Sequence, residues 1–104
     1  YRVAGYFRDA LRLNARVPDN RRRLVQKLDI FLASESFERA VALYRPLGRA
    51  RALDAPVRYR LAYGAVRAGA PELAEKLLWR IRSKGAARLR EVISTCREEP
   101  WLCP

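Results

Sequence analysis

A chain of 104 residues, half of them apolar, is long enough for one domain with a single modest core. Its 22 lysines and arginines against 11 acidic residues give a net charge of +11. This charge favours nucleic acid, an anionic membrane surface or an acidic protein as partner, unless the arginines only form solvated faces. The absence of histidine removes the commonest general base and most zinc sites, and no apolar run approaches the ~20 residues that span a membrane.

Two helices are predicted at the start of the chain. Apolar residues recur at helical spacing over residues 1–16 and again over residues 20–33. Pro18 separates the two helices, because the residue before a proline avoids the α region. Asp19 or Asn20 can then cap the second helix.

A turn and a proline delimit the next predicted helix. Residues 34–36 read as a turn, and the helix that begins near Phe37 has apolar residues at helical spacing. Pro46 is expected to bend or end this helix near Tyr44, since proline lacks the N–H that an interior position needs. Residues 48–53 are then expected to form a loop or a frayed extension.

Residues 54–85 read as one helical hairpin. Pro56 suits the first turn of its first helix, with Asp54 or Ala55 near the cap, because proline has a fixed φ and no N–H. Gly69 is expected to end this helix with a positive φ, and Pro71 begins the second helix. Gly85 is expected to close the hairpin.

The C-terminal end of the chain contains both cysteines. A last helix is predicted over residues 86–97, followed by an irregular tail. Cys96 and Cys103 can close a short disulfide loop if the chain turns at Pro100; the alternative is two unpaired thiols in a mobile tail. A disulfide would favour an extracytoplasmic compartment, periplasmic or secreted.

Two windows of the chain repeat one pattern. Residues 37–43 can be aligned with residues 71–77, an offset of 34, with glutamate, alanine and leucine at matching positions. A period of 34 residues that contains two helices is the signature of a tetratricopeptide-type array. The chain resembles a tetratricopeptide repeat protein at the large apolar, small and turn positions of these windows, which are Leu24, Phe31, Ala40, Tyr44, Leu61, Ala62, Gly69, Ala74 and Leu78.

The resemblance implies an all-α fold of about six helices. Antiparallel helical hairpins would stack as a short, tetratricopeptide-like, right-handed solenoid, and the small residues would let helices approach closely. The expected organisation is one domain, 1–104, with a partial first repeat (1–20), two repeats (21–54 and 55–85), and a capping helix and tail (86–104).

The second repeat also resembles a pentatricopeptide unit. The likeness lies in apolar, aromatic and small residues, which are Val57, Tyr59, Leu61, Gly64, Ala68, Gly69, Ala74 and Leu77, and in Ser83 to Gly85. Proteins of that family read single-stranded RNA, one base per repeat. Because only one window shows the likeness and RNA reading needs a stack of units, RNA binding is the alternative interpretation.

The tetratricopeptide resemblance implies that the first helix of each repeat lines a concave groove. The groove residues would be Arg22, Val25 and Asp29 in the first repeat, and Tyr59, Tyr63 and Arg67 in the second. Arginine pairs with a carboxylate or a phosphate, and tyrosine offers an apolar face with a polar tip. Such a groove suits an extended peptide with acidic groups or a free carboxyl end. The alternative is that the tyrosines pack in the core and the arginines are only solvated.

Arg21, Arg22 and Arg23 form the one tight basic run, and at the start of a helix they oppose the helix dipole. Either the adjacent Asp19 or an acidic ligand can offset this cost. Trp79 is expected to pack in the core or on the convex side rather than to stack on a base.

We therefore expect a non-enzymatic protein–protein interaction or scaffold module, part of a larger protein or complex, without a cofactor, a metal or a small-molecule substrate. The carboxylates lie at helix caps or among lysines and arginines, which argues against a catalytic acid–base pair. The alternatives are an RNA-binding helical repeat and a structural subunit of a nucleoprotein or membrane-associated assembly. Since the chain begins at Tyr1 and contains no methionine, we expect a processed form or a piece of a longer protein.

Overall fold

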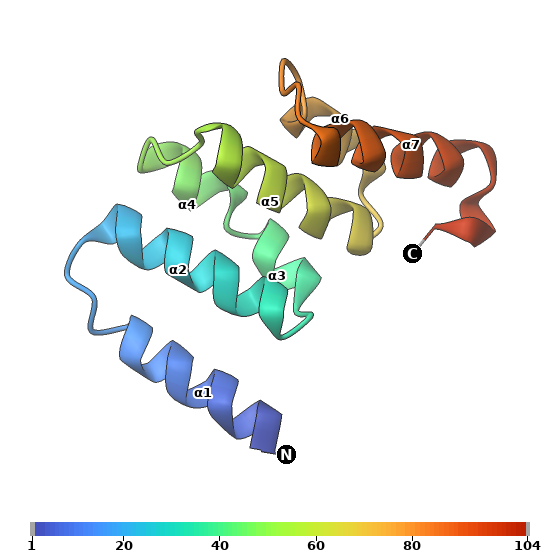
Figure 1. The fold of residues 1–104 in the computed structure, drawn as a ribbon. Coiled ribbons are helices and arrows are strands. Elements are labelled where there is room, and N and C mark those ends of the chain that lie inside the picture. Colours follow the sequence, from blue (N-terminus) through green and yellow to red (C-terminus); the bar gives the residue numbers. More distant parts are fainter. Residues whose placement is uncertain (1, 104) are drawn as a thin grey trace. The chain divides into compact units, whose positions relative to one another are not determined.

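Helices account for all the regular secondary structure of residues 2–103, which the computed structural model describes; for residues 2–4 it describes only the backbone. The all-α prediction is therefore confirmed (Figure 1). The elements in chain order are α1 (Arg2–Asn14), α2 (Asn20–Ala33), α3 (Phe37–Val41), α4 (Tyr44–Arg49), α5 (Ala55–Arg67), α6 (Pro71–Leu77), α7 (Lys84–Glu98) and the short 3-10 helix η1 (Pro100–Leu102).

Side-chain caps determine where three of these helices begin. Asp19, Asp54 and Ser83 precede α2, α5 and α7, and each side chain accepts a hydrogen bond from the backbone N–H three residues further along, at 3.0, 3.1 and 3.1 Å. Such caps satisfy an N–H that has no partner within the helix. The sequence left the first cap open between Asp19 and Asn20 and the second between Asp54 and Ala55, and the cap at Ser83 was not predicted.

The predicted third helix is interrupted, and a new helix begins beyond the break. α3 ends at Val41, residues 42 and 43 form a turn, and α4 starts at Tyr44. Pro46 therefore lies in the first turn of α4, where a missing N–H costs nothing because the first N–H groups of a helix have no internal partner. With α3 and α4 taken as one interrupted helix, the described residues contain the six helices expected. Gly48, expected in a loop, belongs to α4.

Gly69 ends α5 as predicted, with a φ of 82°. The backbone N–H of Ala70 bonds the carbonyl of Ala65 at 2.8 Å, which closes the helix with a Schellman motif. The same 6→1 bond follows α2 and α4, but there the residues in the left-handed region are Glu35 (φ 57°) and Arg51 (φ 56°). Residues other than glycine are strained in this region. The ends of α2 and α4 therefore contain backbone strain that a glycine would remove.

Glycine at these two strained positions is expected to stabilise the protein. Glu35→Gly and Arg51→Gly should each raise the free energy of unfolding by about 0.5–1 kcal/mol, because glycine adopts positive φ without strain. Gly69→Ala should lower it by about 1 kcal/mol; a Cβ at Gly69 would meet nothing within 4 Å, so the loss reports the backbone alone. Urea denaturation measures all three effects.

A glutamate-to-glycine change inside a helix is the matched control. Glu38→Gly, at an exposed position in the first turn of α3, should destabilise the protein by about 1 kcal/mol, because glycine has a low helix propensity and the change removes an acidic side chain that interacts favourably with the helix dipole. Destabilisation by Glu35→Gly of the same size as by Glu38→Gly would contradict the account of this helix end.

Gly85 does not close the hairpin, so that prediction was wrong. α6 ends at Leu77, and Gly85 lies in the first turn of α7. A Cβ added at Gly85 would lie 2.9 Å from the Tyr59 hydroxyl oxygen and 3.1 Å from the ring carbon that bears it. The glycine therefore permits a close approach between α7 and the Tyr59 side chain, which backbone reasoning about helix ends could not reveal.

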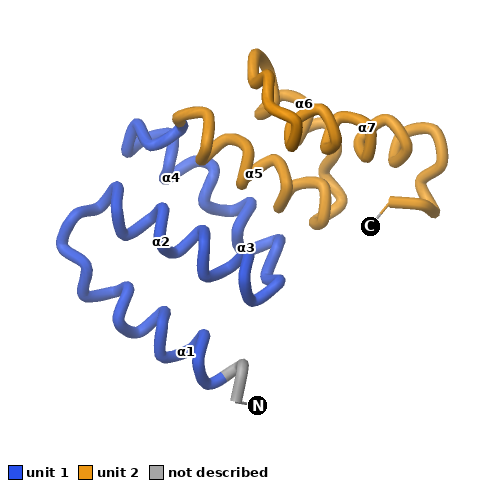
Figure 2. The backbone as a smooth tube through the Cα atoms, in the orientation of Figure 1, with its two compact units in different colours: residues 1–53 blue, residues 54–104 orange. Residues whose placement is uncertain are grey.

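The chain divides into two compact units, residues 1–53 and residues 54–104 (Figure 2). The division follows residue 53, whereas the boundary predicted between the two repeats follows residue 54. The buried apolar residues of the first unit are Leu24, Leu28, Phe31, Ala40, Leu43, Leu47 and Ala52. Those of the second unit are Val57, Leu61, Ala62, Ala65, Val66, Ala74, Leu77, Leu78, Ile81, Ala86, Leu89, Ile93 and Cys96.

A buried asparagine joins α1 to α2 in the first unit. Asn14 is 1% exposed, and its amide nitrogen donates to the Arg23 carbonyl at 2.8 Å and to the Gln26 side-chain oxygen at 3.0 Å. A buried polar group needs such partners, because leaving it unpaired costs the full desolvation of the group. The amide therefore fixes the end of α1 against the first turns of α2.

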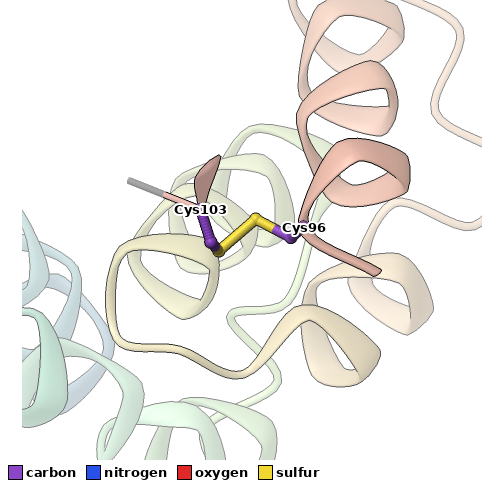
Figure 3. The surroundings of a disulfide bond; sticks show 2 residues. All are labelled: Cys96 and Cys103. Carbon is purple, nitrogen blue, oxygen red and sulfur yellow. A yellow bond between two sulfur atoms is a disulfide. The ribbon is translucent and has the colours of Figure 1, made fainter. Parts of the chain in front are cut away.

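A disulfide joins Cys96, near the end of α7, to Cys103, just after η1 (Figure 3). The bond was one of two alternatives left open by the sequence. Cys96 is buried, whereas the loop it closes exposes Trp101 and Leu102 at 77% and 55%. The disulfide thus holds an apolar loop end in solvent next to the last helix.

Candidate functional site

The predicted groove residues of the first unit lie on one face of α2. Arg22, Val25 and Asp29 follow helical spacing and line one open depression of about 530 Å³. Arg22 and Asp29 are exposed, and Val25 is half-buried. The other residues that line the depression are Asp19, Arg21 and Gln26. The depression thus combines two arginines with two aspartates.

The basic run at the start of α2 separates into two structural arginines and one that is presented to solvent. Arg21 donates from its Nε to the Ala50 carbonyl at 2.9 Å, which satisfies an oxygen at the end of α4. Arg23 donates to the Val17 carbonyl at 3.2 Å and to the Asn20 side chain at 2.6 Å. These two side chains therefore hold the backbone of the first unit, while Arg22 remains exposed on the α2 surface.

Asp19 supplies the negative charge that the start of α2 needs. Its carboxylate accepts the Arg22 backbone N–H, and this hydrogen bond is the main reason that its pKa is lowered from the ordinary value. Desolvation, the second-largest effect, raises the pKa, whereas a backbone hydrogen bond from Arg21 and the charges of both arginines lower it further. An ionised carboxylate at a helix N-terminus also interacts favourably with the helix dipole.

Acidification is expected to weaken this cap. Because the folded state lowers the pKa of Asp19, its carboxylate stabilises the fold above the unfolded value of about 3.9, and the contribution is lost as the pH falls through the lower folded value. Asp19→Asn keeps the cap but does not titrate. The stability of the wild type relative to Asp19→Asn should therefore rise from pH 2 to pH 5 in urea denaturation. Parallel pH profiles would show that Asp19 does not carry this effect.

The predicted groove residues of the second unit lie on α5, where two of the three contact each other. Arg67 donates to the Tyr63 hydroxyl at 3.1 Å, and its guanidinium carbon lies 6.0 Å from the centre of the Tyr63 ring. Tyr63 is 38% exposed. Tyr59 is half-buried, and its hydroxyl oxygen lies 2.9 Å from the position that a Cβ on Gly85 would occupy. Tyr63 and Arg67 therefore form a surface pair, and Tyr59 takes part in packing.

The structure thus places the six groove residues in two sets, one in each compact unit. Arg22, Val25 and Asp29 belong to the first unit, and Tyr59, Tyr63 and Arg67 to the second. A single groove that combines both sets stays a prediction.

Trp79 was expected in the core or on the convex packing face, but its side chain is 63% exposed. It lies in the turn after α6, beside a cleft of about 420 Å³ between α6 and α7. The guanidinium of Arg80 lies over the Trp79 ring, 4.3 Å from its centre. The residues that line the cleft are Glu75, Leu78, Trp79, Arg80, Arg90, Ile93, Ser94 and Arg97.

Arginine side chains fix the turn that bears Trp79. Arg90 donates to the carbonyls of Leu78 and Ile81 at 2.8 and 2.6 Å, and Arg58 donates to the Trp79 carbonyl at 3.0 Å. These carbonyls lie beyond the end of α6, and that of Leu78 also accepts the backbone N–H of Ile81 at 3.0 Å. The sequence contained no local signal for this cleft, because α6 ends at Leu77 without a glycine and Arg80 takes the positive φ, 63°.

The part of the chain that the structure describes contains no group of three or more cysteines, aspartates or glutamates placed to hold a metal ion. None of its helices is long and apolar enough to cross a membrane. The chemistry available at the described surfaces is charge pairing by guanidinium groups and contact with exposed aromatic rings. No protein-family model, no curated protein and no solved structure matches the chain.

Proposed function

We propose that this chain is a non-enzymatic interaction module that binds an acidic segment of another protein, in the manner of a short tetratricopeptide-like array. The observation that supports the proposal most is that arginines predicted to face a partner lie on accessible helix faces: Arg22 beside the α2 depression and Arg67 next to Tyr63 on α5. A guanidinium group binds a carboxylate through paired hydrogen bonds, and tyrosine adds apolar contact.

The excess of positive charge supports an acidic partner. Because net charge of one sign accelerates and favours encounter with the opposite sign, a chain at +11 selects acidic segments over basic ones. Helical faces present such side chains at fixed spacing, so an extended segment can be read by several residues at once.

Two substitutions test the proposal. Arg22→Ala and Arg67→Ala, separately and together, should weaken binding of a pool of acidic peptides at physiological salt, each by about tenfold if its arginine makes a charge-assisted hydrogen bond. Fluorescence anisotropy with labelled peptides measures the affinities.

Arg8→Ala with Arg88→Ala is the matched control, because it removes the same charge from exposed positions outside both faces. Equal losses from the control and from the Arg22, Arg67 pair would show that charge alone, and not these faces, drives binding. A single-stranded RNA pool is the second arm: tight RNA binding with no peptide binding would replace the proposal by the RNA interpretation. If the RNA affinity falls steeply with added salt and does not depend on the bases, the chain contacts only the phosphates of the RNA.

The disulfide supports an oxidising compartment as the place where the module works. Disulfides persist in secreted and periplasmic proteins and are rare where thiols are kept reduced. Mass spectrometry of the native protein under non-reducing conditions should find Cys96 and Cys103 joined. Free thiols in the protein isolated from its source would remove this part of the proposal.

A further inference from the structure

The cleft between α6 and α7 has the apolar surface of a binding site. Its volume of about 420 Å³ falls within the ~300–1,000 Å³ of typical ligand pockets. Leu78 and Ile93, 0% and 3% exposed, lie at its base, and the Trp79 ring stands beside it, 63% exposed. An exposed tryptophan next to apolar side chains can bury a bulky apolar group of a partner.

Four charged residues surround this apolar surface. They are Arg80, Arg90, Arg97 and Glu75. Three positive charges and one negative charge leave the lining with a net charge of +2. Arg90 donates hydrogen bonds to the backbone carbonyls of Leu78 and Ile81 and thereby holds the turn that follows α6. Arg97 pairs with Glu75 at 2.8 Å, and both side chains are about half exposed, at 49% and 53%. An exposed ion pair of this kind is weak enough to exchange with an incoming anion.

We propose that this cleft binds an acidic protein segment in which a bulky apolar side chain lies next to a carboxylate. The apolar side chain contacts Trp79 and the base formed by Leu78 and Ile93, and carboxylates of the segment pair with Arg80 and with Arg97. The inference rests on the proposed function, since it takes the partner to be an acidic protein segment, and it adds a surface distinct from the α2 depression and the Tyr63–Arg67 pair.

A protein segment fits this cleft better than a nucleic acid does. Stacking of a base needs a free aromatic face, and the Arg80 guanidinium, 4.3 Å from the centre of the Trp79 ring, leaves only one face of that ring for it. The apolar base of the cleft matches an aliphatic or aromatic side chain, whereas a nucleotide would place polar edges and a phosphate there. Arg80, stacked on the ring, still presents its N–H groups at its edge to a carboxylate.

Glu75 acts as a built-in competitor for Arg97. Because its carboxylate occupies Arg97, an incoming carboxylate must displace it before it can pair. Glu75→Gln removes the competing charge and keeps the size of the side chain. This variant should therefore bind an acidic peptide about two- to fivefold more tightly, the range expected for an exposed ion pair.

Trp79 itself reports occupancy of the cleft. In the Trp101→Phe background, which leaves one tryptophan in the chain, a peptide of alternating glutamate and leucine should shift the Trp79 emission on binding. Arg80→Gln should weaken this peptide about tenfold. Arg82→Gln is the matched control: it removes the same charge at an exposed position that does not line the cleft, and should leave the affinity nearly unchanged.

Comparison peptides separate the possible results. A peptide of alternating glutamate and serine should bind more weakly than the glutamate–leucine peptide, because it has no apolar group for the cleft. Equal effects of Arg80→Gln and Arg82→Gln, or no change in Trp79 emission on saturation, would overturn the cleft proposal. If either of these results is found, but the peptide still binds the wild type and no longer binds the Arg22→Ala, Arg67→Ala variant, the proposed function is supported and only the cleft proposal fails. A shift of Trp79 emission by oligouridylate but not by the peptides would instead assign the cleft to single-stranded RNA.

Discussion

Leu28→Ala is expected to lower the free energy of unfolding by about 2–5 kcal/mol, the range for truncation of a fully buried leucine. Leu28 has no exposed surface and lies on the buried face of α2, between Leu24 and Phe31 in helical spacing. Its removal leaves a cavity that the surrounding side chains fill only in part. Urea denaturation followed by circular dichroism measures the loss of stability.

Leu13→Ala provides the same chemical change at an exposed position. Leu13 lies on α1 with 63% of its surface accessible. Its truncation should therefore alter stability by no more than about 0.5 kcal/mol. Similar losses for Leu28→Ala and Leu13→Ala would contradict the assignment of the first unit's core to the buried face of α2.

Loss of the disulfide is expected to have the next largest effect. Cys103→Ser should lower the free energy of unfolding by roughly 2–3 kcal/mol, because the bond closes a short loop, with a sequence separation of 7, and thereby restricts the unfolded chain. The variant should also free η1 from α7, so that the backbone N–H groups of Leu102 and Cys103, which bond the carbonyls of Glu99 and Pro100, exchange with solvent more rapidly. Denaturation and hydrogen exchange measure the two effects.

Chemical reduction is the control for the cysteine variant. Reduced wild type should have the stability of Cys103→Ser, and the reductant should leave Cys103→Ser unchanged, since no other cysteine pair exists in the chain. If reduction leaves the wild type as stable as before, the loop closed by Cys96 and Cys103 contributes nothing to the fold.

Helix starts could be predicted from the sequence because their signals are local. Asp19, Asp54 and Pro71 each define a start through a cap or a fixed φ, and the structure has α2, α5 and α6 begin next to them. Gly69 similarly marks the end of α5. In these cases one residue type and its neighbours decide the conformation, without help from distant parts of the chain.

Other helix ends could not be predicted, because the deciding contacts are not local. Glu35, Arg51 and Arg80 take a positive φ without being glycine, so no residue type announces the turn. Backbone hydrogen bonds and packing within each unit hold these residues at positive φ, although this conformation is strained for a residue with a side chain. Gly85 shows the converse: a glycine that suggested a helix end is required for the approach of Tyr59.

The residues of a candidate surface could be predicted from the sequence where helical spacing alone places them on one face of a helix. Arg22, Val25 and Asp29 share a face of α2, and Tyr63 contacts Arg67 one turn later on α5, as spacing requires. Tyr59 and Trp79 depend on tertiary packing: the first is held against Gly85, and the second is exposed because the turn at Arg80 ends α6 early. The cleft between α6 and α7 therefore became visible only in the structure.

The most direct test of the proposed function compares binding of an acidic peptide pool and a single-stranded RNA pool to the wild-type chain at physiological salt, with the Arg22→Ala, Arg67→Ala variant beside it. We expect acidic peptides to bind the wild type and the double variant to bind them far more weakly, while the Arg8→Ala, Arg88→Ala control retains most of the affinity. Tight RNA binding that the double variant leaves intact, together with no peptide binding, would contradict the account.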